Sequence, residues 1–179
     1  MGKYFGTDGF RGEANIDLTV EHAYKVGRFL GSYYSKDGKK CRVVIGKDTR
    51  RSSYMFEYSL VAGLTASGAD VYLLHVTTTP SVSYVVRSDD FDCGIMISAS
   101  HNPYYDNGIK VINGNGEKLE EEVIEKIEGY IDGPDDAIAF ATKENIGRTV
   151  DYAAGRNRYI GYLISIATRS FKGKKVALD

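Results

Sequence analysis

The chain has 179 residues, 42% of them hydrophobic and 26% charged, and its formal net charge at pH 7 is −1. This composition is typical of a globular protein with one core and room for the start of a second. A charge near zero argues against a general binder of nucleic acid or anionic membranes, although it is compatible with a local basic pocket for a small phosphate. No apolar run reaches the length of a membrane span or a signal peptide, so we expect a cytoplasmic protein.

Strand and helix patterns alternate over the first half of the chain. Thr19 can cap a helix over 20–34, because apolar residues recur there at steps of three and four. The patterns of the next segments predict strands over 41–46, 69–76 and 93–98, separated by a helix over 52–68 and a shorter helix over 80–88. Helical crossovers of this kind make the three strands parallel.

One further strand is expected to run in the opposite direction. The run GIKVIN at 108–113 follows the preceding strand after a turn that is too short for a crossover, so it should be antiparallel. A turn at 113–118 and an acidic amphipathic helix at 119–131 come next.

The last third of the chain has a different character. Residues 133–155 carry turn formers with little periodicity and are interpreted as an excursion or linker, whereas 157–171 favours a helix and 174–179 a strand. We therefore expect an α/β fold. Its three-layer domain, at 1–155, has a mixed, mostly parallel sheet between helices, and the first helix and strand of a second, similar domain follow at 156–179.

The motifs of several common chemistries are missing from the sequence. It contains no GxSxG elbow, no P-loop, no HExxH pair and no GxGxxG after a strand. Cys41 and Cys93 are far apart and match no metal-binding spacing, so we expect buried, reduced thiols. Ser100 and His101 are direct neighbours, which is a poor arrangement for a nucleophile and its base and argues against a serine hydrolase.

The stretch ISASHNPYYDNGIK, at 97–110, concentrates polar chemistry between two apolar runs. A loop held on two rigid strand ends is where functional sites are commonly built. Ser100 stands in this loop among hydrogen-bonding and cationic residues. An exposed serine in such surroundings has the makings of a phosphoryl acceptor.

Four segments carry a resemblance to a known family: FGTDGFRG, GKDTRRSS, TTTPSVSY and SASHNPYYDNGIK, in this order over residues 4–110. Together they resemble domain 1 of the α-D-phosphohexomutases, and most of all its bacterial phosphoglucosamine mutase branch. RNRYIGYL and KKVALD look, more weakly, like the entry into domain 2. Members of this family have four domains that close over one active site, so the resemblance implies an N-terminal fragment that is inactive by itself.

The resemblance implies an isomerase activity in the full-length parent: interconversion of glucosamine 6-phosphate and glucosamine 1-phosphate. Ser100 would be a phosphoserine that donates its phosphate to one end of the sugar and recovers the other phosphate from a hexosamine bisphosphate intermediate. Mg²⁺ would be held by a phosphate oxygen on Ser100 and by aspartates of domain 2, a motif to which Asp48 does not belong. The resemblance also implies a homodimer through domain 1, whereas the expectation of no nucleic-acid or membrane partner rests on the near-neutral charge.

The same resemblance assigns catalytic roles to Ser100, His101, Lys110 and Arg11, and substrate- or phosphate-binding roles to Thr7, Asp8, Arg11 and Asn102. His101 would contact the phosphoserine or the reacting oxygen, and Lys110 would transfer a proton beside the reacting hydroxyl. Arg11 would bind phosphate through its guanidinium fork. Structural alternatives exist: His101 as a turn residue, and Lys110 as a solvated edge charge. Asn102 and Pro103 are expected chiefly to shape the loop.

A basic cluster follows the first predicted parallel strand. It consists of Lys47, Arg50 and Arg51, in GKDTRRSS. A run of cations after a strand is usually a solvated surface. We therefore expect these three side chains to face water.

Two other functions stay open at this point. The first is a phosphomannomutase or phosphoglucomutase, because the loop that reads the sugar hydroxyls would lie in another domain. The second is a non-catalytic domain that binds a phosphosugar or assembles with a partner protein.

Overall fold

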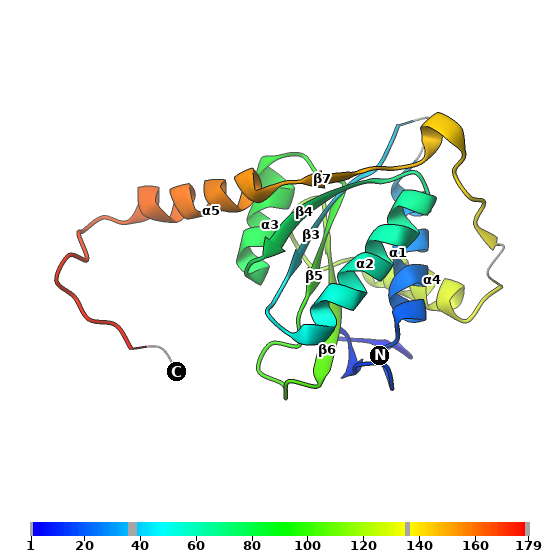
Figure 1. Cartoon of the computed structure of the whole chain (residues 1–179), viewed down its shortest axis with the longest axis horizontal. Coiled ribbons are helices and arrows are strands. Elements are labelled where there is room, and N and C mark those ends of the chain that lie inside the picture. The colour runs from blue at the N-terminus through cyan, green and yellow to red at the C-terminus, as the bar shows by residue number, and fades with distance from the viewer. Residues whose placement is uncertain (1, 36–38, 135–136, 178–179) are drawn as a thin grey trace.

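A computed structural model describes residues 2–35, 39–134 and 137–177 (Figure 1). These residues form a seven-stranded sheet in the order β1-β2-β6-β5-β3-β4-β7, with helices packed on both of its faces. The three-layer α/β architecture predicted from the sequence is therefore confirmed.

The elements in chain order are β1 (Phe5–Gly6), β2 (Gly9–Glu13), α1 (Val20–Tyr34), β3 (Arg42–Lys47), α2 (Arg51–Ala66), β4 (Asp70–Val76), α3 (Thr79–Ser88), β5 (Cys93–Ile97), β6 (Asp106–Asn113), α4 (Glu121–Ile131), a 3₁₀ turn (Lys143–Asn145), β7 (Thr149–Asp151) and α5 (Ala153–Ile166). Thr19 caps α1 as predicted, since its hydroxyl accepts the N–H of His22 at 3.3 Å. The strands β3, β4 and β5 are parallel and β6 is antiparallel to β5, which confirms the predicted directions.

Alternate residues of the central strands β3 to β6 supply two separate cores. On β3, Val43 and Ile45 pack with apolar residues of α1, α2 and α4, whereas Val44 packs with α3 residues such as Val82. Successive side chains of a strand point to opposite faces, so a continuous apolar run is what a strand covered on both sides requires.

Three strands were not expected from the sequence. β1 and β2 form an edge hairpin that pairs β2 antiparallel with β6. β7 pairs parallel with β4 at the other edge. It lies inside the 133–155 stretch interpreted as a linker, so that interpretation is wrong for Thr149–Asp151. A strand this short shows no detectable alternation and forms because its partner strand is already in place.

The C-terminal part extends away from the body of the molecule (Figure 1). α5 begins before the predicted helix at 157–171, runs without a break across the proposed boundary at 155/156, and ends at Ile166. The strand predicted at 174–179 does not form over Lys174–Ala177, and its last two residues lie outside the described part of the chain. A strand needs a partner for its backbone hydrogen bonds, and no described strand pairs with this segment.

Cys41 and Cys93 are both buried and unbridged, as predicted. A hydrogen bond with Cys41, together with burial, raises the pKa of the Cys93 thiol well above its ordinary value. Among the described residues, the helices are too short or too polar to cross a bilayer.

Candidate active site

The loop that joins β5 to β6, residues 98–105, is here called the Ser100 loop. It follows the carboxyl end of β5, beside the carboxyl end of the parallel strand β3. The two strand ends are joined where the N–H of Asp48 donates to the carbonyl oxygen of Ile97 at 2.9 Å. The crevice at the carboxyl ends of parallel strands is where α/β sheets bind ligands.

Ser100 is exposed and has a φ of 58°, in the left-handed region. This conformation costs an L residue other than glycine about 1–2 kcal/mol, so the surroundings must hold it. The Ser100 N–H donates to Ser98 Oγ at 3.0 Å, and Ser100 Oγ lies 3.4 Å from Nδ1 of His101. The loop therefore brings together two of the predicted catalytic side chains.

Arg11 and Lys110 lie on one face of the ladder between β2 and β6, since Arg11 pairs with Gly108 and Lys110 is two residues further along β6. A Cβ at Gly108 would come within 2.9 Å of Arg11 Cγ, and a Cβ at Gly9 within 3.1 Å of Lys110 Cγ. The two glycines thus leave room for the two long cations to lie across the neighbouring strand.

The guanidinium of Arg11 is only partly satisfied by the protein. Nη2 lies 3.3 Å from Oδ2 of Asp8, and Nη1 donates to Oδ1 of Asn102 at 3.5 Å, the outer limit for a hydrogen bond. Nε is buried and has no hydrogen-bond partner among the described residues. Buried donors are normally paired, so an unpaired guanidinium N–H beside the Ser100 loop indicates a position for an anion.

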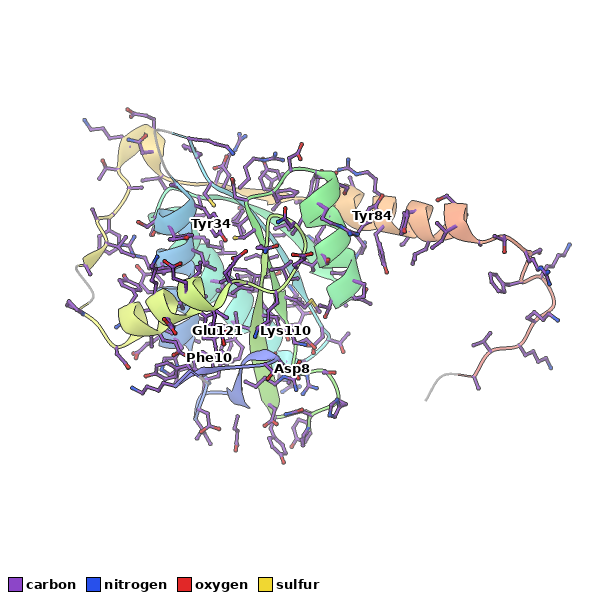
Figure 2. All side chains as sticks on the ribbon, turned by 180° about the vertical axis from the view of Figure 1, so that it is seen from behind. Asp8, Phe10, Tyr34, Tyr84, Lys110 and Glu121 are labelled. Carbon is purple, nitrogen blue, oxygen red and sulfur yellow. The ribbon has the colours of Figure 1, made fainter. Side chains whose placement is uncertain are left out.

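A cavity of about 350 Å³ adjoins this cluster. Lys110, Thr7 and Asp8 line it, together with the start of α3. Figure 2 shows Lys110 and Asp8 near each other at one end of the sheet. Ser100 and His101 are not among its lining residues. The predicted residues form two adjacent groups, joined by the ion pair of Arg11 and Asp8: the loop group Ser100, His101, Asn102 and Arg11, and the cavity group Thr7, Asp8 and Lys110.

The N-terminal segment that carries the cavity group is tied down by Glu128 of α4. The Glu128 carboxylate accepts the backbone N–H groups of Lys3, Tyr4 and Phe5 at 2.9, 2.8 and 2.7 Å. Burial raises the pKa of Glu128, but these three bonds lower it by more, so the net shift is downward. This carboxylate therefore fixes β1 and, with it, the turn that presents Thr7 and Asp8.

Arg50 was expected to face water, and this expectation is wrong. Its side chain is 11% exposed, and its guanidinium points into the Ser100 loop. Nη2 donates to the carbonyl oxygens of Ser100 at 3.0 Å and of Asn102 at 2.8 Å, while Nη1 donates to those of Pro103 and Asp106. Sequence reasoning found the loop but missed the residue that holds it.

A buried polar chain continues beneath Arg50. Asp48 accepts the Nε–H of Arg50 at 2.9 Å and the hydroxyl of Ser53 at 2.7 Å. Asn107, which is fully buried, donates to Ser53 Oγ at 2.9 Å. One sequence signal could have revealed this series of hydrogen bonds: an Asp-x-Arg segment directly after a strand whose carboxyl end lies beside the loop.

Lys47 is also buried, contrary to the expectation, whereas Arg51 is exposed as expected. The Lys47 ammonium forms an ion pair with Glu57 of α2 and lies 4.3 Å from the ring centroid of Tyr54. Buried charges need such partners, and the partners of Lys47 come from a helix that follows it in the chain. Lys47 therefore supports the sheet–helix contact on the face opposite Arg11 and Lys110.

No group of three or more His, Cys, Asp or Glu side chains that could hold a metal ion occurs in the described part of the chain.

Comparisons with known proteins agree with the fold and with the family that the sequence resembles. The model of the phosphoglucomutase/phosphomannomutase α/β/α domain I matches residues 2–137. A phosphoglucosamine mutase of Lachnoclostridium phytofermentans is 80% identical over 179 residues, and one of Lachnospira eligens is 74% identical over 181. Both alignments cover 100% of this chain and 40% of the relative, so the chain spans about 40% of the length of these curated relatives.

A solved phosphoglucomutase/phosphomannomutase family protein of Burkholderia thailandensis shares the fold, with a TM-score of 0.75 over 93% of this chain and 36% of that one. Its sequence identity is 22%, which supports the fold alone. Because the family model covers most of the sequence, the chain belongs to the phosphoglucomutase/phosphomannomutase family, through its α/β/α domain I.

Proposed function

We propose that this chain supplies the phosphoserine-bearing part of a phosphoglucosamine mutase, which interconverts glucosamine 6-phosphate and glucosamine 1-phosphate. The observation that carries the proposal is an exposed, left-handed Ser100 in a loop that Arg11 contacts through Asn102, where the buried Nε–H of Arg11 has no partner among the described residues. The identity of 80% to a phosphoglucosamine mutase supports the choice of sugar. The longer protein in which we propose that this chain occurs is called the parent.

In this proposal Ser100 Oγ carries the transferred phosphoryl group. A hydroxyl oxygen of the sugar phosphate attacks phosphorus, the bond from phosphorus to Ser100 Oγ breaks, and a sugar bisphosphate forms. The reverse step with the other phosphate restores the phosphoserine and releases the isomer. Phosphoryl transfer depends on in-line positioning and on neutralised charge more than on a strong nucleophile.

The neighbouring side chains have separate tasks. Arg11 binds phosphate oxygens through Nε–H and an Nη group, because a guanidinium fork matches phosphate geometry. His101, whose Nδ1 lies 3.4 Å from Ser100 Oγ, donates a hydrogen bond to the phosphoserine or to the reacting oxygen. Lys110, which faces the cavity, acts in its neutral amine form: it takes the proton of the attacking hydroxyl, and the proton is then returned to Ser100 Oγ, the leaving oxygen.

The cavity beside Lys110 receives the sugar end of the substrate. Its volume of about 350 Å³ is within the range of small-molecule sites, about 300–1,000 Å³. Thr7 and Asp8 offer a hydroxyl and a carboxylate to sugar hydroxyls, and the ion pair of Asp8 with Arg11 couples sugar binding to phosphate binding. The ligand that this chain would supply to Mg²⁺ is a phosphate oxygen on phosphorylated Ser100.

The domain boundary at 155/156 remains part of the proposal. α5 exposes Ile160, Leu163 and Ile164, by 48, 43 and 69%. A helix with such a surface fits the start of a second packed unit in the parent.

The test is to locate the phosphate. We expect the parent, incubated with glucose 1,6-bisphosphate, to carry one phosphate on Ser100 by peptide mass spectrometry and to convert glucosamine phosphates in a coupled assay. Ser100→Ala should abolish both signals without lowering the melting temperature, because a loop serine contributes little to packing. Ser88→Ala, at the exposed end of α3, is the matched control.

The alternatives give different results in the same experiment. Faster turnover of mannose or glucose phosphates than of glucosamine phosphates would identify the other mutase specificities. A parent that binds phosphosugar without turnover, or a Ser100→Ala variant that keeps its turnover, would contradict the proposal.

A further inference from the structure

Arg50 uses both Nη groups of its guanidinium to hold the Ser100 loop and the start of β6. A guanidinium has five N–H donors. In Arg50 the Nε–H binds Asp48 at 2.9 Å, and the two Nη groups together bind four backbone carbonyl oxygens, those of Ser100, Asn102, Pro103 and Asp106. All five donors are therefore occupied by the protein, and none remains for a phosphate. This separates Arg50 from Arg11, whose Nε–H has no partner in the described part of the chain.

The bonds from Arg50 and Ser98 fix both peptide groups that flank the Cα of Ser100. The preceding peptide is held through the Ser100 N–H, which donates to Ser98 Oγ at 3.0 Å. The following peptide is held through the Ser100 carbonyl oxygen, which accepts from Arg50 Nη2 at 3.0 Å. Orienting these two peptides determines the φ and ψ of Ser100, and φ is the disfavoured value of 58°.

The guanidinium is itself held in place from below. Oδ1 of Asp48 accepts the backbone N–H of Arg50 at 3.0 Å as well as the hydroxyl of Ser53, and Asn107 completes the chain from β6. The chain joins the end of β3, the first turn of α2 and β6, which are rigid elements. A side chain supported by such partners has one orientation, which is what precise placement of another group requires.

We infer that Arg50 is a positioning residue for phosphoryl transfer: it holds Ser100 in the left-handed conformation that directs Oγ to the incoming phosphoryl group. The inference rests on the proposed function of Ser100 and adds a residue that touches neither substrate nor phosphate. Lysine cannot replace arginine here, because an ammonium offers three donors from one point instead of a planar fork.

The experiment compares Arg50→Lys with the wild-type parent. We expect amide hydrogen exchange in residues 99–106 to accelerate, and the kcat for mutase turnover to fall about 10- to 100-fold, since a small misplacement of reacting groups has effects of this size. The KM for the sugar phosphate should change by less than about threefold, because Arg50 makes no contact with substrate in this assignment. Guanidinium ion added to Arg50→Ala should restore part of the lost rate.

Arg42→Lys is the matched control. Arg42 also donates its guanidinium to backbone carbonyl oxygens, those of Asp89 at 3.3 Å and Asp90 at 3.5 Å, but at the opposite end of β3. The Arg42→Lys substitution should leave both the kcat and the amide hydrogen exchange of residues 99–106 unchanged. If Arg50→Lys does not fold, Asp48→Asn removes the charge that holds the Arg50 Nε–H and is expected to give the same pattern.

Each other outcome overturns the inference. A kcat that stays normal in Arg50→Lys, a change confined to KM, or a slow variant whose loop exchanges like wild type would each rule out positioning through the loop. The failure of the proposed function is separate, because it appears as a wild-type parent without phosphate on Ser100. In that case Arg50 would hold a loop that takes no part in transfer, which would also end the role assigned to it.

Discussion

Two loops of this molecule are each held by one arginine that is buried or nearly so, but only one of these loops has the features of an active site. Arg50 binds the carbonyl oxygens of the Ser100 loop. Arg28 of α1, which is 1% exposed, binds one carbonyl oxygen of the segment between α4 and β7 and two groups at the end of α2. It donates to the carbonyl oxygen of Ile138, and its guanidinium lies 4.0 Å from the ring centroid of Phe140. The same physical device therefore serves both loops.

The difference lies in what surrounds each anchor. Buried side-chain atoms without a partner occur, among the described residues, on Arg11, Glu57 and Ser81. Of these, Arg11 contacts the Ser100 loop, through Asn102, and none lies in the segment between α4 and β7. An anchored loop becomes a candidate site when it displays a reactive group beside donors that the protein leaves open. Substitutions should accordingly change rate at one loop and stability at the other.

Removing Lys110 should have the largest effect and should act on rate alone. We expect Lys110→Ala to slow mutase turnover of the parent by about 10²–10⁴-fold, the usual range for loss of a general acid–base group. Phosphate on Ser100 should still be detected by mass spectrometry, and the melting temperature should stay near the wild-type value. Lys126→Ala, an exposed lysine on α4, is the control. Equal loss of rate in both variants would contradict the assignment.

Removing Arg28 should act on stability alone. Arg28→Met keeps an apolar stem but leaves the carbonyl oxygens of Ala66 and Ile138 and the hydroxyl of Ser67 without their donor. We expect the free energy of unfolding of the 179-residue chain, measured with urea, to fall by about 2–4 kcal/mol. The exposed Arg51→Met should change it by less than about 0.5 kcal/mol.

Arg28→Met should leave phosphorylation of Ser100 unchanged when the parent is assayed below its melting temperature. Loss of this phosphorylation in molecules that are still folded would contradict the distinction between the two loops.

The N-terminal tether gives a smaller, pH-dependent effect. The folded-state pKa of Glu128 is below its unfolded value, so its contribution to stability is present above the unfolded pKa, about 4.3, and is lost as the pH falls through the folded value. The free energy of unfolding should therefore fall more steeply below about pH 4.3 in wild type than in Glu128→Gln. Glu125→Gln, on the exposed side of α4, should keep the wild-type slope. Identical pH slopes in all three proteins would contradict the stabilising role of Glu128.

Substitution of Ile164 in α5 should have the smallest effect, because this side chain is mostly exposed. Ile164 is 69% exposed, and Ile164→Ser should change the unfolding free energy of the 179-residue chain by less than about 0.5 kcal/mol. Ile127→Ala, at a fully buried position of α4, should reduce it by about 2–5 kcal/mol and serves as the contrast. A clearly larger loss for Ile164→Ser in the parent than in this chain would support the second packed unit.

The sequence predicted the elements whose pattern is long enough to detect. α1, α2, α3 and α4 and the strands β3 to β6 each show an apolar run or a helical period, and they form at or near the expected residues. β7 has three residues and β1 two, which is too short for alternation to be visible. The same limit applied at the site. The Ser100 loop was recognisable because its residues form one contiguous sequence motif. The exposure of Arg50 and Lys47, which depends on distant residues, was predicted wrongly.

By itself, the sequence determined the layer order, the directions of the central strands and the segment that carries the reactive groups, because each follows from neighbouring residues and from connection length. Only the tertiary structure decided which cations are buried and which are open. The carbonyl oxygens that bind Arg50 belong to residues about 50 positions further along the chain and occupy its Nη groups, while Arg11 keeps an N–H that no described residue binds. Whether a charged side chain faces water depends on contacts with residues that are distant in the sequence and come close only in the folded chain. A local sequence pattern does not predict such contacts.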